Sequence, residues 1–345
     1  MEMLAPYTTL RLGGPARDFA EATSAEQLVS LVAEADRTST PTLVLGGGSN
    51  LVVADEGFDG LVIKVATEGV TFTRDREQIV VTAEAGEDWD ALVARAVSEG
   101  WSGIECMSGV PGQVGSTPIQ NVGAYGQEVA QTVRCVRAYD RLTRQVVDIE
   151  ARQCGFSYRD SVFKRDLSRY VVLAVTYTLD VSALSGPLAY EELARRLGTE
   201  AGGRVPLAEA REAVLALRRG KGMVLDPDDP DTRSAGSFFT NPILTAEQAA
   251  ELAVRAPGHP QWEVPGGLVK VPAAWLIEQA GFAKGYERGP VRISTKHTLA
   301  LTNPTGAATT RDLLALAREV RDGVREKFGV TLVNEPVMVG CTLGE

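Results

Sequence analysis

Three polar side chains that could act as an acid, a base or an electrostatic stabiliser lie far apart in the chain. Arg159 lies in a polar turn, Ser237 stands between a glycine and two aromatic residues, and Glu335 precedes a proline. Each also has an ordinary interpretation: a surface arginine, a turn serine and a carboxylate at the end of a strand. Their chemistry alone does not join the three into one site.

The two histidines, His259 and His297, both lie in the last third of the chain. Their placement excludes a Ser-His-Asp hydrolase in the N-terminal half, a multi-histidine metal centre and a flavin linked to histidine there. None of the four cysteines lies in a C-x-x-C pair, so we predict no metal site and expect buried thiols in a reducing compartment. The cysteines are Cys106, Cys135, Cys154 and Cys341.

Residues 46–50 read Gly-Gly-Gly-Ser-Asn and follow a predicted strand. Consecutive glycines let backbone N–H groups converge on an anion. The segment has neither the Lys-Ser/Thr of a phosphate-binding P-loop nor the G-x-G-x-x-G fingerprint. A plain tight turn explains it equally well.

Residues 109–126 form a second glycine-rich segment, which is more informative. It holds five glycines and two prolines in eighteen residues, a poor composition for a helix or a central strand. An extended loop of small residues can lie against a flat ligand and offer it backbone donors. A purely structural loop would explain the glycines but not the interleaved Gln120, Asn121 and Tyr125. We therefore favour a ligand-binding loop.

Around these segments, short β-rich runs alternate with amphipathic helices, which is typical of α+β or α/β proteins. We expect Ser24 to cap the first helix and Gln27 to complete a capping box. The polar segment 225–231 resembles a domain boundary. The pattern predicts helices over 24–37, 88–99, 207–219, 245–256, 272–280 and 310–328, and strands over 42–45, 61–65, 79–83, 133–139, 145–149, 171–179, 299–302 and 337–341.

Charge and length narrow the class of protein. At 345 residues, the chain is long enough for two or three domains. The net charge of −10 offers no basic face for nucleic acid or anionic lipid, although a local pocket for one phosphorylated ligand is compatible with it. Residues 1–14 lack the pattern of a signal peptide, and no apolar run is long enough to cross a bilayer. We expect a cytoplasmic protein without membrane or nucleic-acid partners.

Taken in order, these motifs closely resemble those of the UDP-N-acetylenolpyruvoylglucosamine reductase family, from about residue 8 to residue 340. The resemblance implies an α+β fold with a two-part FAD-binding region of the vanillyl-alcohol-oxidase type and a C-terminal α+β substrate-binding domain. The expected parts are 1–70, to which a strand near 335–345 can return, 71–219 and 220–334. The matching segments are 12–16, 46–50, 109–126, 158–161, 236–242 and 334–336.

The resemblance also implies non-covalent FAD, NADPH as co-substrate, and UDP-N-acetylglucosamine enolpyruvate as the substrate of a monomeric enzyme. FAD would be held mainly by backbone donors. The implied FAD-contacting residues are Gly46, Gly47, Gly48, Ser49, Asn50, Pro111, Gly112, Gly115, Ser116, Gln120, Asn121, Gly123, Ala124, Tyr125, Gly126 and Arg218.

By the same resemblance, hydride passes from NADPH to flavin N5 and then to the terminal carbon of the enolpyruvyl group. Arg159 offsets the charge that develops on the substrate carboxylate. Glu335 polarises the same group, which requires it to be protonated or to orient a donor. Ser237 donates the proton to the neighbouring carbon. The product, UDP-N-acetylmuramate, is a peptidoglycan precursor, which implies a role in cell-wall biogenesis, cell shape and cell division.

The implied substrate or nicotinamide contacts are carried over position by position. The run Pro-Leu-Ala-Tyr at 187–190 is similar to the branch of the family that covers its substrate with a tyrosine loop. The family often has Tyr in place of Trp262 and Gln in place of His297. The implied contacts are Tyr190, Lys221, Asn241, Trp262, Lys270, Lys284 and His297.

Two alternatives stay open at this point. One is another flavin enzyme of the same fold, such as an oxidase of alcohols or sugars, which would consume oxygen and need no NADPH. The other is a catalytically silent nucleotide-sugar binding protein, which would carry no flavin. Arg159, Ser237 and Glu335 are all present, and binding alone gives no reason for that combination, so we favour an enzyme.

Overall fold

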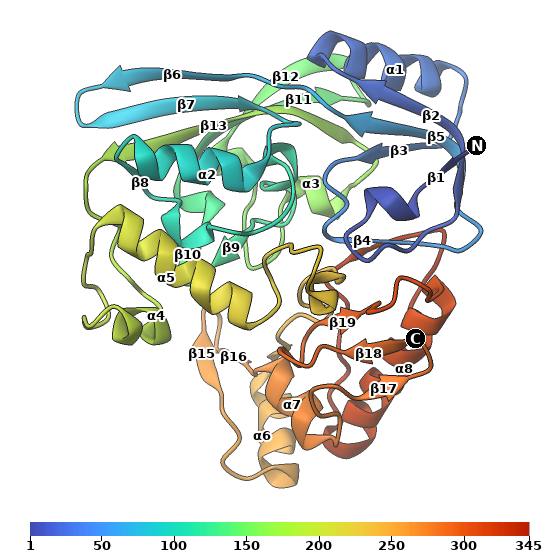
Figure 1. Ribbon diagram of the computed structural model, residues 1–345, viewed down its shortest axis with the longest axis vertical. Helices are drawn as coiled ribbons and strands as arrows, with labels where there is room; N and C mark the ends of the chain where they lie inside the picture. Colours follow the sequence, from blue (N-terminus) through green and yellow to red (C-terminus); the bar gives the residue numbers. More distant parts are fainter. Residues whose placement is uncertain (345) are drawn as a thin grey trace. The chain divides into compact units, whose positions relative to one another are not determined.

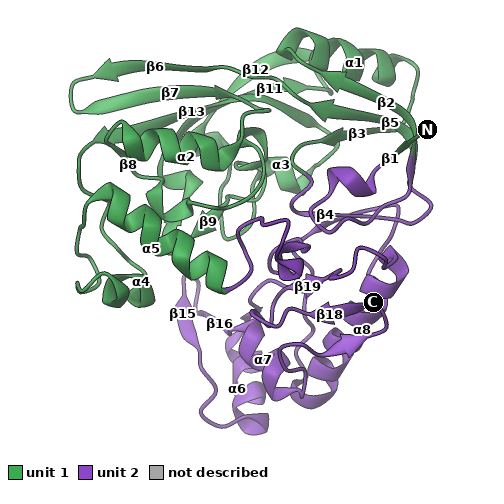
Figure 2. Cartoon of the chain, in the orientation of Figure 1, with its two compact units in different colours: residues 1–2, 16–47, 59–220 green, residues 3–15, 48–58, 221–345 purple. Residues whose placement is uncertain are grey.

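The computed structural model describes residues 1–344, which form two compact units (Figure 2). Unit 1 contains Met1–Glu2, Ala16–Gly47 and Asp59–Gly220. Unit 2 contains Met3–Pro15, Gly48–Phe58 and the chain from Lys221 onward. Residues 3–15 and 48–58, which we expected within the first FAD-binding part, therefore belong to the unit formed by the C-terminal half.

The N-terminal part of the chain forms a four-stranded sheet in the order β1-β2-β5-β3 (Figure 1). Its strands are Glu2–Met3, Pro15–Ala22, Phe58–Val65 and Thr42–Leu45, in that spatial order. The last two are parallel, with Leu43 opposite Val62. The predicted strands at 42–45 and 61–65 are thus confirmed, whereas β2 was not predicted because polar and apolar residues do not alternate regularly along it.

Helix α1, Ala25–Arg37, follows the second strand and buries Leu28, Val32 and Ala35, which share one face. Ser24 caps it as predicted, its Oγ accepting a hydrogen bond from Gln27 N at 3.2 Å. The predicted capping box is wrong in its second half. Gln27 Oε1 accepts from Thr23 N at 3.0 Å and so reaches one residue beyond the cap.

The second sheet of unit 1 is antiparallel, in the order β12-β11-β13-β7-β6, with β8 also pairing with β13 (Figure 1). Three predicted strands form its centre, each slightly longer than predicted, and exposed β6 was missed because its side chains give no buried face. The bounds are Val70–Asp75 for β6, Gln78–Glu84 for β7, Trp101–Ser102 for β8, Val133–Asp140 for β11, Gln145–Glu150 for β12 and Tyr170–Val181 for β13.

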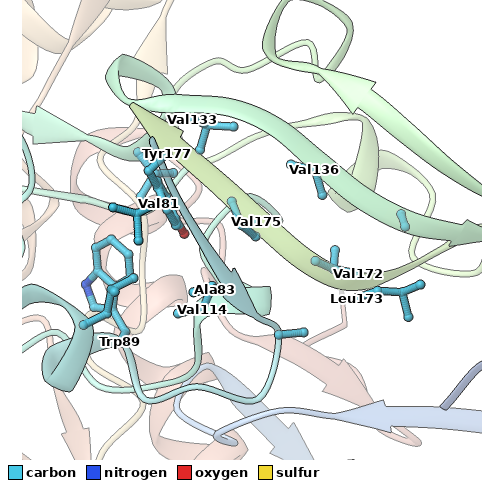
Figure 3. Packing of buried hydrophobic residues seen from close by; sticks show 14 of the residues in the cluster. Val81, Ala83, Trp89, Val114, Val133, Val136, Val172, Leu173, Val175 and Tyr177 are labelled. Atoms are coloured by element: carbon cyan, nitrogen blue, oxygen red, sulfur yellow. The ribbon is translucent and has the colours of Figure 1, made fainter. Parts of the chain in front are cut away.

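Helix α2, Trp89–Ser98, packs on this sheet through Trp89 (Figure 3). The Trp89 and Tyr177 rings lie 5.8 Å apart between centroids. The Tyr177 hydroxyl lies 2.7 Å from Thr117 Oγ1, inside the second glycine-rich segment. The neighbouring Val114 is fully buried in the same core. The sheet therefore holds the middle of the second glycine-rich segment in place through Thr117 and Val114.

Of the remaining helices of unit 1, the one at Val162–Arg165 packs on the larger core through Phe163, and the other two enclose a smaller apolar cluster that includes Leu188. The buried thiols Cys106 and Cys154 belong to the unit's cores, and burial raises the pKa of each to about 12. All four cysteines are free. The helices are α3 (Val162–Arg165), α4 (Glu191–Arg196) and α5 (Leu207–Gly220).

Unit 2 surrounds a second core with three helices and three small sheets, and its helices confirm the predictions at 245–256, 272–280 and 310–328. β4, Leu51–Val53, pairs in parallel with β20, Val337–Val339. The C-terminal strand thus returns to the first seventy residues. The other elements are β14 (Ile243–Leu244), α6 (Ala246–Arg255), β15 (Trp262–Val264), β16 (Leu268–Lys270), α7 (Ala273–Gln279), β17 (Glu287–Arg288), β18 (Val291–Ile293), β19 (Leu301–Thr302) and α8 (Thr310–Phe328).

The predicted boundary segment lies just inside unit 2 and is not a bare linker. Residues Pro230–Thr232 form a short 3-10 helix, and Asp231 and Thr232 are buried. Within residues 1–344, none of the helices combines the length and the apolar character needed to cross a membrane.

Candidate active site

The two glycine-rich segments meet backbone to backbone in unit 1. A Cβ atom placed on Gly47 would lie 2.8 Å from Gly112 Cα, and one on Gly46 would lie 2.8 Å from Ser116 Oγ. A Cβ on Gly115 would lie 2.6 Å from Ala85 Cβ. Side chains at Gly46 or Gly47 would push the two segments apart, and one at Gly115 would push the second segment away from Ala85. The predicted loops at 46–50 and 109–126 are thus brought together by close contact that only glycine allows.

Gly48, Ser49 and Asn50 continue the first glycine-rich segment into unit 2. Gly48 has φ +61°, and a Cβ there would lie 1.9 Å from Tyr7 O. Asn50 O accepts a hydrogen bond from Val337 N at 3.0 Å, which attaches the segment to the strand after Glu335.

Gln113 was not among the predicted site residues. Its Nε2 donates to Val65 O at 3.1 Å and Gly86 O at 2.9 Å, and two carbonyl acceptors fix which way the amide points. The Oε1 atom is buried and accepts no hydrogen bond from residues 1–344. A Cβ on Gly46 would lie 3.3 Å from it. Because a buried unpaired oxygen is costly, Gln113 presents a ready acceptor beside the first glycine-rich segment.

Arg159 lies on a tight turn that is docked on the second glycine-rich segment. Its Nη2 donates to Gly123 O at 2.9 Å, and its guanidinium lies 5.4 Å from the centre of the Tyr158 ring. Ser161 Oγ donates to Ile119 O at 2.5 Å. Arg159 has φ +54°, a left-handed conformation that is rare outside glycine. It is a half-buried arginine fixed against the loop, so the interpretation as an ordinary surface residue is wrong.

The side chain of Asn121 is fully used inside the protein. Its Nδ2 donates to Glu128 Oε2 at 2.9 Å and to Ser157 O at 3.0 Å, while its Oδ1 accepts from Ala130 N at 3.1 Å. Neither N–H of the Asn121 side chain is therefore left to donate to a ligand. The residue holds the Arg159 turn and the short hairpin of β9 (Gly123–Ala124) and β10 (Gln127–Glu128) together.

The tyrosine loop packs on the end of the second glycine-rich segment. The Tyr125 and Tyr190 rings meet edge to face, with their centroids 5.3 Å apart. A Cβ on Gly126 would lie 2.9 Å from Ala189 Cβ. Burial raises the pKa of the Tyr125 phenol to about 12, so the hydroxyl stays protonated and can donate a hydrogen bond.

Two further charged groups support this loop from α2 and α5. Arg218 is almost fully buried, which lowers its pKa from the ordinary value, while the nearby Tyr125 and Asp90 oppose that shift. Asp90 accepts two hydrogen bonds from Arg211, at 2.6 and 2.8 Å, and one from Gly109 N at 2.6 Å. Asp90 therefore holds the first residue of the loop in place.

We predict that Asp90→Asn lowers the free energy of unfolding by about 1 kcal/mol or more at pH 7, because one partly exposed, charge-assisted pair is lost. Burial works against ionisation, but Arg211 and Gly109 N together lower the pKa of Asp90. The stabilisation is then fully present above the unfolded pKa of about 3.9 and is lost as the pH falls through the lower folded value. Urea unfolding at a series of pH values measures it. The exposed Asp75→Asn serves as the control, and a pH-independent difference would contradict the prediction.

Ser237 and Glu335 are brought together within unit 2, although they are far apart in the sequence. Glu335 N donates to Phe238 O at 2.8 Å, and Phe239 bridges to Asn334. The buried Phe238 and Phe239 side chains fix this stretch in the unit's core. The serine hydroxyl and the glutamate carboxyl are thus attached to neighbouring backbone.

The predicted substrate contacts of unit 2 fall into two groups. Trp262 and Lys270 are directly opposite each other on the antiparallel β15–β16 hairpin, so their side chains share one face. Lys284 and His297 lie on adjacent loops. Gly285 N donates to Ser294 O at 3.2 Å, and Ser294 Oγ accepts from His297 N at 3.2 Å.

The other two predicted contacts have different settings. Asn241 Oδ1 accepts a hydrogen bond from Ala273 N at 3.0 Å, so this side chain caps α7 and leaves only its amide donors for a ligand. Lys221 is the first residue of the long C-terminal part of unit 2.

The comparisons with known proteins match almost the whole chain. A family model described as FAD binding domain matches residues 16–145, and one described as UDP-N-acetylenolpyruvoylglucosamine reductase, C-terminal domain, matches residues 228–339. The reductase of Thermobifida fusca is 58% identical, covering 99% of this chain and 97% of its own length. That of Streptomyces coelicolor is 57% identical over 99% and 90%. The crystal structure of the Thermus caldophilus reductase is 28% identical, with a TM-score of 0.66 over 98% of this chain and 97% of its own.

The fold and the paired glycine-rich loops define the class: an oxidoreductase that binds FAD, with an α+β fold as predicted. The extent of the matches then gives the family. The chain belongs to the UDP-N-acetylenolpyruvoylglucosamine reductases.

The residues present fit an FAD molecule. The loops at Gly46–Gly47 and Gly112 carry no side chains that would obstruct it, and the buried Gln113 Oε1 requires a donor. FAD offers hydroxyl and amino donors, and its diphosphate accepts from backbone N–H groups. The paired loops thus present a buried side-chain acceptor, Gln113 Oε1, beside Gly46.

We predict that Gln113→Met weakens FAD binding by about tenfold or more, because it removes the acceptor and leaves two carbonyl groups unpaired. Titration of the FAD-free protein with FAD, followed by flavin fluorescence, measures this affinity. The exposed Gln145→Met, on β12, is the matched control. Equal affinity of the Gln113 and Gln145 variants would contradict a role for this oxygen.

Proposed function

We propose that the protein reduces UDP-N-acetylglucosamine enolpyruvate to UDP-N-acetylmuramate in peptidoglycan precursor synthesis, with NADPH as the hydride source. The observation that carries the proposal is the hydrogen bond between Glu335 N and Phe238 O, which brings the backbone of Glu335 next to the residue that follows Ser237. The name shared by the relatives supports the substrate. Bound FAD supplies the chemistry of hydride transfer.

Arg159 is proposed to bind the substrate carboxylate. Its bond to Gly123 O at 2.9 Å orients the guanidinium, a planar cation suited to binding a carboxylate. A fixed cation offsets negative charge as it develops, without having to reorganise. The left-handed backbone of Arg159 is consistent with a residue held in place for a task.

Ser237 is proposed to donate the proton that completes the reduction. A neutral serine is a weak acid, but the carbon next to a developing enolate is basic enough to take its proton. Glu335 assists only as a protonated acid or through a donor that it orients, since a bare carboxylate would repel the enolate.

The remaining roles follow the same proposal. FAD would lie along the two glycine-rich segments, and Tyr190, Lys221 and Asn241 would contact the substrate or the nicotinamide. Trp262, Lys270, Lys284 and His297 would contact the UDP part. Residues 1–70 and 71–219 would form the two FAD-binding parts, and 220–334 the substrate-binding part. We further propose a monomer without nucleic-acid or membrane partners, working in the cytoplasm, where thiols such as its four free cysteines stay reduced.

Stopped-flow mixing tests the function directly. The purified yellow protein is first mixed anaerobically with NADPH, and we expect the flavin absorbance to bleach. Addition of UDP-N-acetylglucosamine enolpyruvate should then restore the absorbance with formation of UDP-N-acetylmuramate. Restoration by oxygen alone would indicate an oxidase, and a colourless protein would indicate a binding protein. Either result would overturn the proposal.

A further inference from the structure

A buried carboxylate, Asp231, lies shortly before Ser237 and takes no part in the proposed chemistry. Its side chain is 2% exposed. One oxygen accepts a hydrogen bond from Arg292 Nη2 at 3.0 Å. The other accepts from Thr295 N at 3.2 Å and from Thr295 Oγ1 at 2.5 Å. Asp231 therefore ties the segment before Ser237 to the loop that follows β18.

A second carboxylate strengthens the same attachment. Asp229 Oδ1 accepts a hydrogen bond from Asp231 N at 3.1 Å and so caps the short helix Pro230–Thr232. Its other oxygen pairs with Lys296 Nζ at 2.6 Å. Two neighbouring acidic residues thus bind two neighbouring residues of the 295–299 loop.

The same loop is attached again on the other side of Ser237. Phe238 N donates to Leu299 O at 2.7 Å. The loop therefore contacts the Ser237 segment at both ends, and His297 lies between the two attachments. Since His297 N and Lys296 N both donate to Ser294 Oγ, the turn has a defined internal shape.

Between Asp231 and Ser237 the chain is also held by Ser234, whose carbonyl accepts a hydrogen bond from Thr9 Oγ1 at 2.6 Å, and by the buried Ala235, whereas Gly236 is loosely packed. A Cβ placed on Gly236 would meet no atom of the described residues within 4 Å, and Gly236 has φ +70°. The position of Ser237 then depends on the attachments on either side of Gly236 rather than on contacts at Gly236 itself. Among these, Asp231 and Phe238 are the two that join the segment to the 295–299 loop.

We propose that Asp231 is a positioning residue that fixes Ser237 relative to the His297 loop. This inference rests on the proposed function, in which Ser237 is the proton donor and His297 contacts the nucleotide end of the substrate. Binding of the nucleotide end then steadies the loop, and the loop holds the serine through Asp231. The carboxylate thereby couples recognition of the UDP part to proton transfer at the distant enolpyruvyl group.

The alternative hypothesis, that Asp231 only stabilises the fold, predicts a different result. If Asp231 only stabilised unit 2, its loss would lower the amount of folded protein but leave the rates of the folded fraction unchanged. If Asp231 positions Ser237, its loss slows only the step that uses Ser237, because a misplacement of about 1 Å can cost about 10²-fold in rate.

The test compares Asp231→Asn and Thr295→Val with Asp228→Asn, an exposed neighbour in the same segment that undergoes the same change of charge. Thr295 is exposed, so Thr295→Val removes one hydrogen bond to Asp231 without disturbing the core. Thr295→Ser keeps the hydroxyl and serves as the rescue variant. For each holoenzyme, stopped-flow absorbance measures flavin reduction by NADPH and flavin reoxidation by UDP-N-acetylglucosamine enolpyruvate, in H₂O and in D₂O.

We expect flavin reduction to stay within about twofold of wild type in every variant. Reoxidation should slow about 10- to 100-fold in Asp231→Asn and about three- to tenfold in Thr295→Val, with a larger solvent isotope effect. Thr295→Ser and Asp228→Asn should match wild type. Unchanged reoxidation in both Asp231→Asn and Thr295→Val, or equal slowing of both half-reactions, would overturn the inference. Wild-type protein that does not reoxidise with this substrate would instead overturn the proposed function.

Discussion

Replacing Ser237 with alanine is expected to leave reduction of the flavin by NADPH intact and to slow product formation by about 10²–10⁴-fold. The serine is attached to unit 2 beside Glu335, and its hydroxyl is the proposed source of the proton. Hydride transfer from NADPH needs no proton from Ser237, so only the second half-reaction should fail. Stopped-flow absorbance of the flavin separates the two steps.

Thr331→Ala is a suitable control for this variant, because Thr331 is an exposed hydroxyl residue of the same unit. It should reduce and reoxidise the flavin at wild-type rates. Normal turnover of Ser237→Ala would remove Ser237 from the mechanism.

The second large effect is expected at Arg159. Arg159→Lys keeps the charge but loses the planar fork that can bind Gly123 O and a ligand together. We therefore expect the rate of flavin reoxidation by the substrate to fall about 10²–10³-fold, a loss typical for one electrostatic donor. Flavin reduction by NADPH should change little.

Arg152→Lys is the matched control, because Arg152 is exposed and lies in the short 3-10 helix Ala151–Gln153 shortly before the turn. Single-turnover reoxidation rates at saturating substrate distinguish a loss in the chemical step from weaker binding. A variant with lysine at position 159 that turns over normally would show that charge alone suffices there.

The sequence predicted the regular helices well because caps and apolar periodicity are local signals. Ser24, Asp88 and Thr245 each cap a helix as their residue type suggests. The second glycine-rich segment was also recognisable, since its composition is compatible with neither a helix nor a central strand. The family resemblance joined Arg159, Ser237 and Glu335, and their roles stay predictions.

What the sequence could not reveal depends on contacts between distant residues. Nothing near Gln113 in the chain indicates that its amide would be fixed by Val65 O and Gly86 O. Asp231 lies in a run of aspartates that looks like a solvated linker, yet its carboxylate is buried against Thr295. The polar residues themselves were visible in the sequence, but the partners of Gln113 and Asp231 lie more than twenty residues away from them in the chain.

The parallel pairing of β4 with β20 has a consequence for folding during synthesis on the ribosome. During translation Leu51–Val53 is made well before its partner Val337–Val339. At about 5–20 residues per second, β4 waits roughly 15–60 s for its partner. During that interval it is an unpaired apolar strand edge, the kind of surface that chaperones shield. Unit 2 can therefore close only after Val337–Val339 has been made, whatever the order in which unit 1 folds.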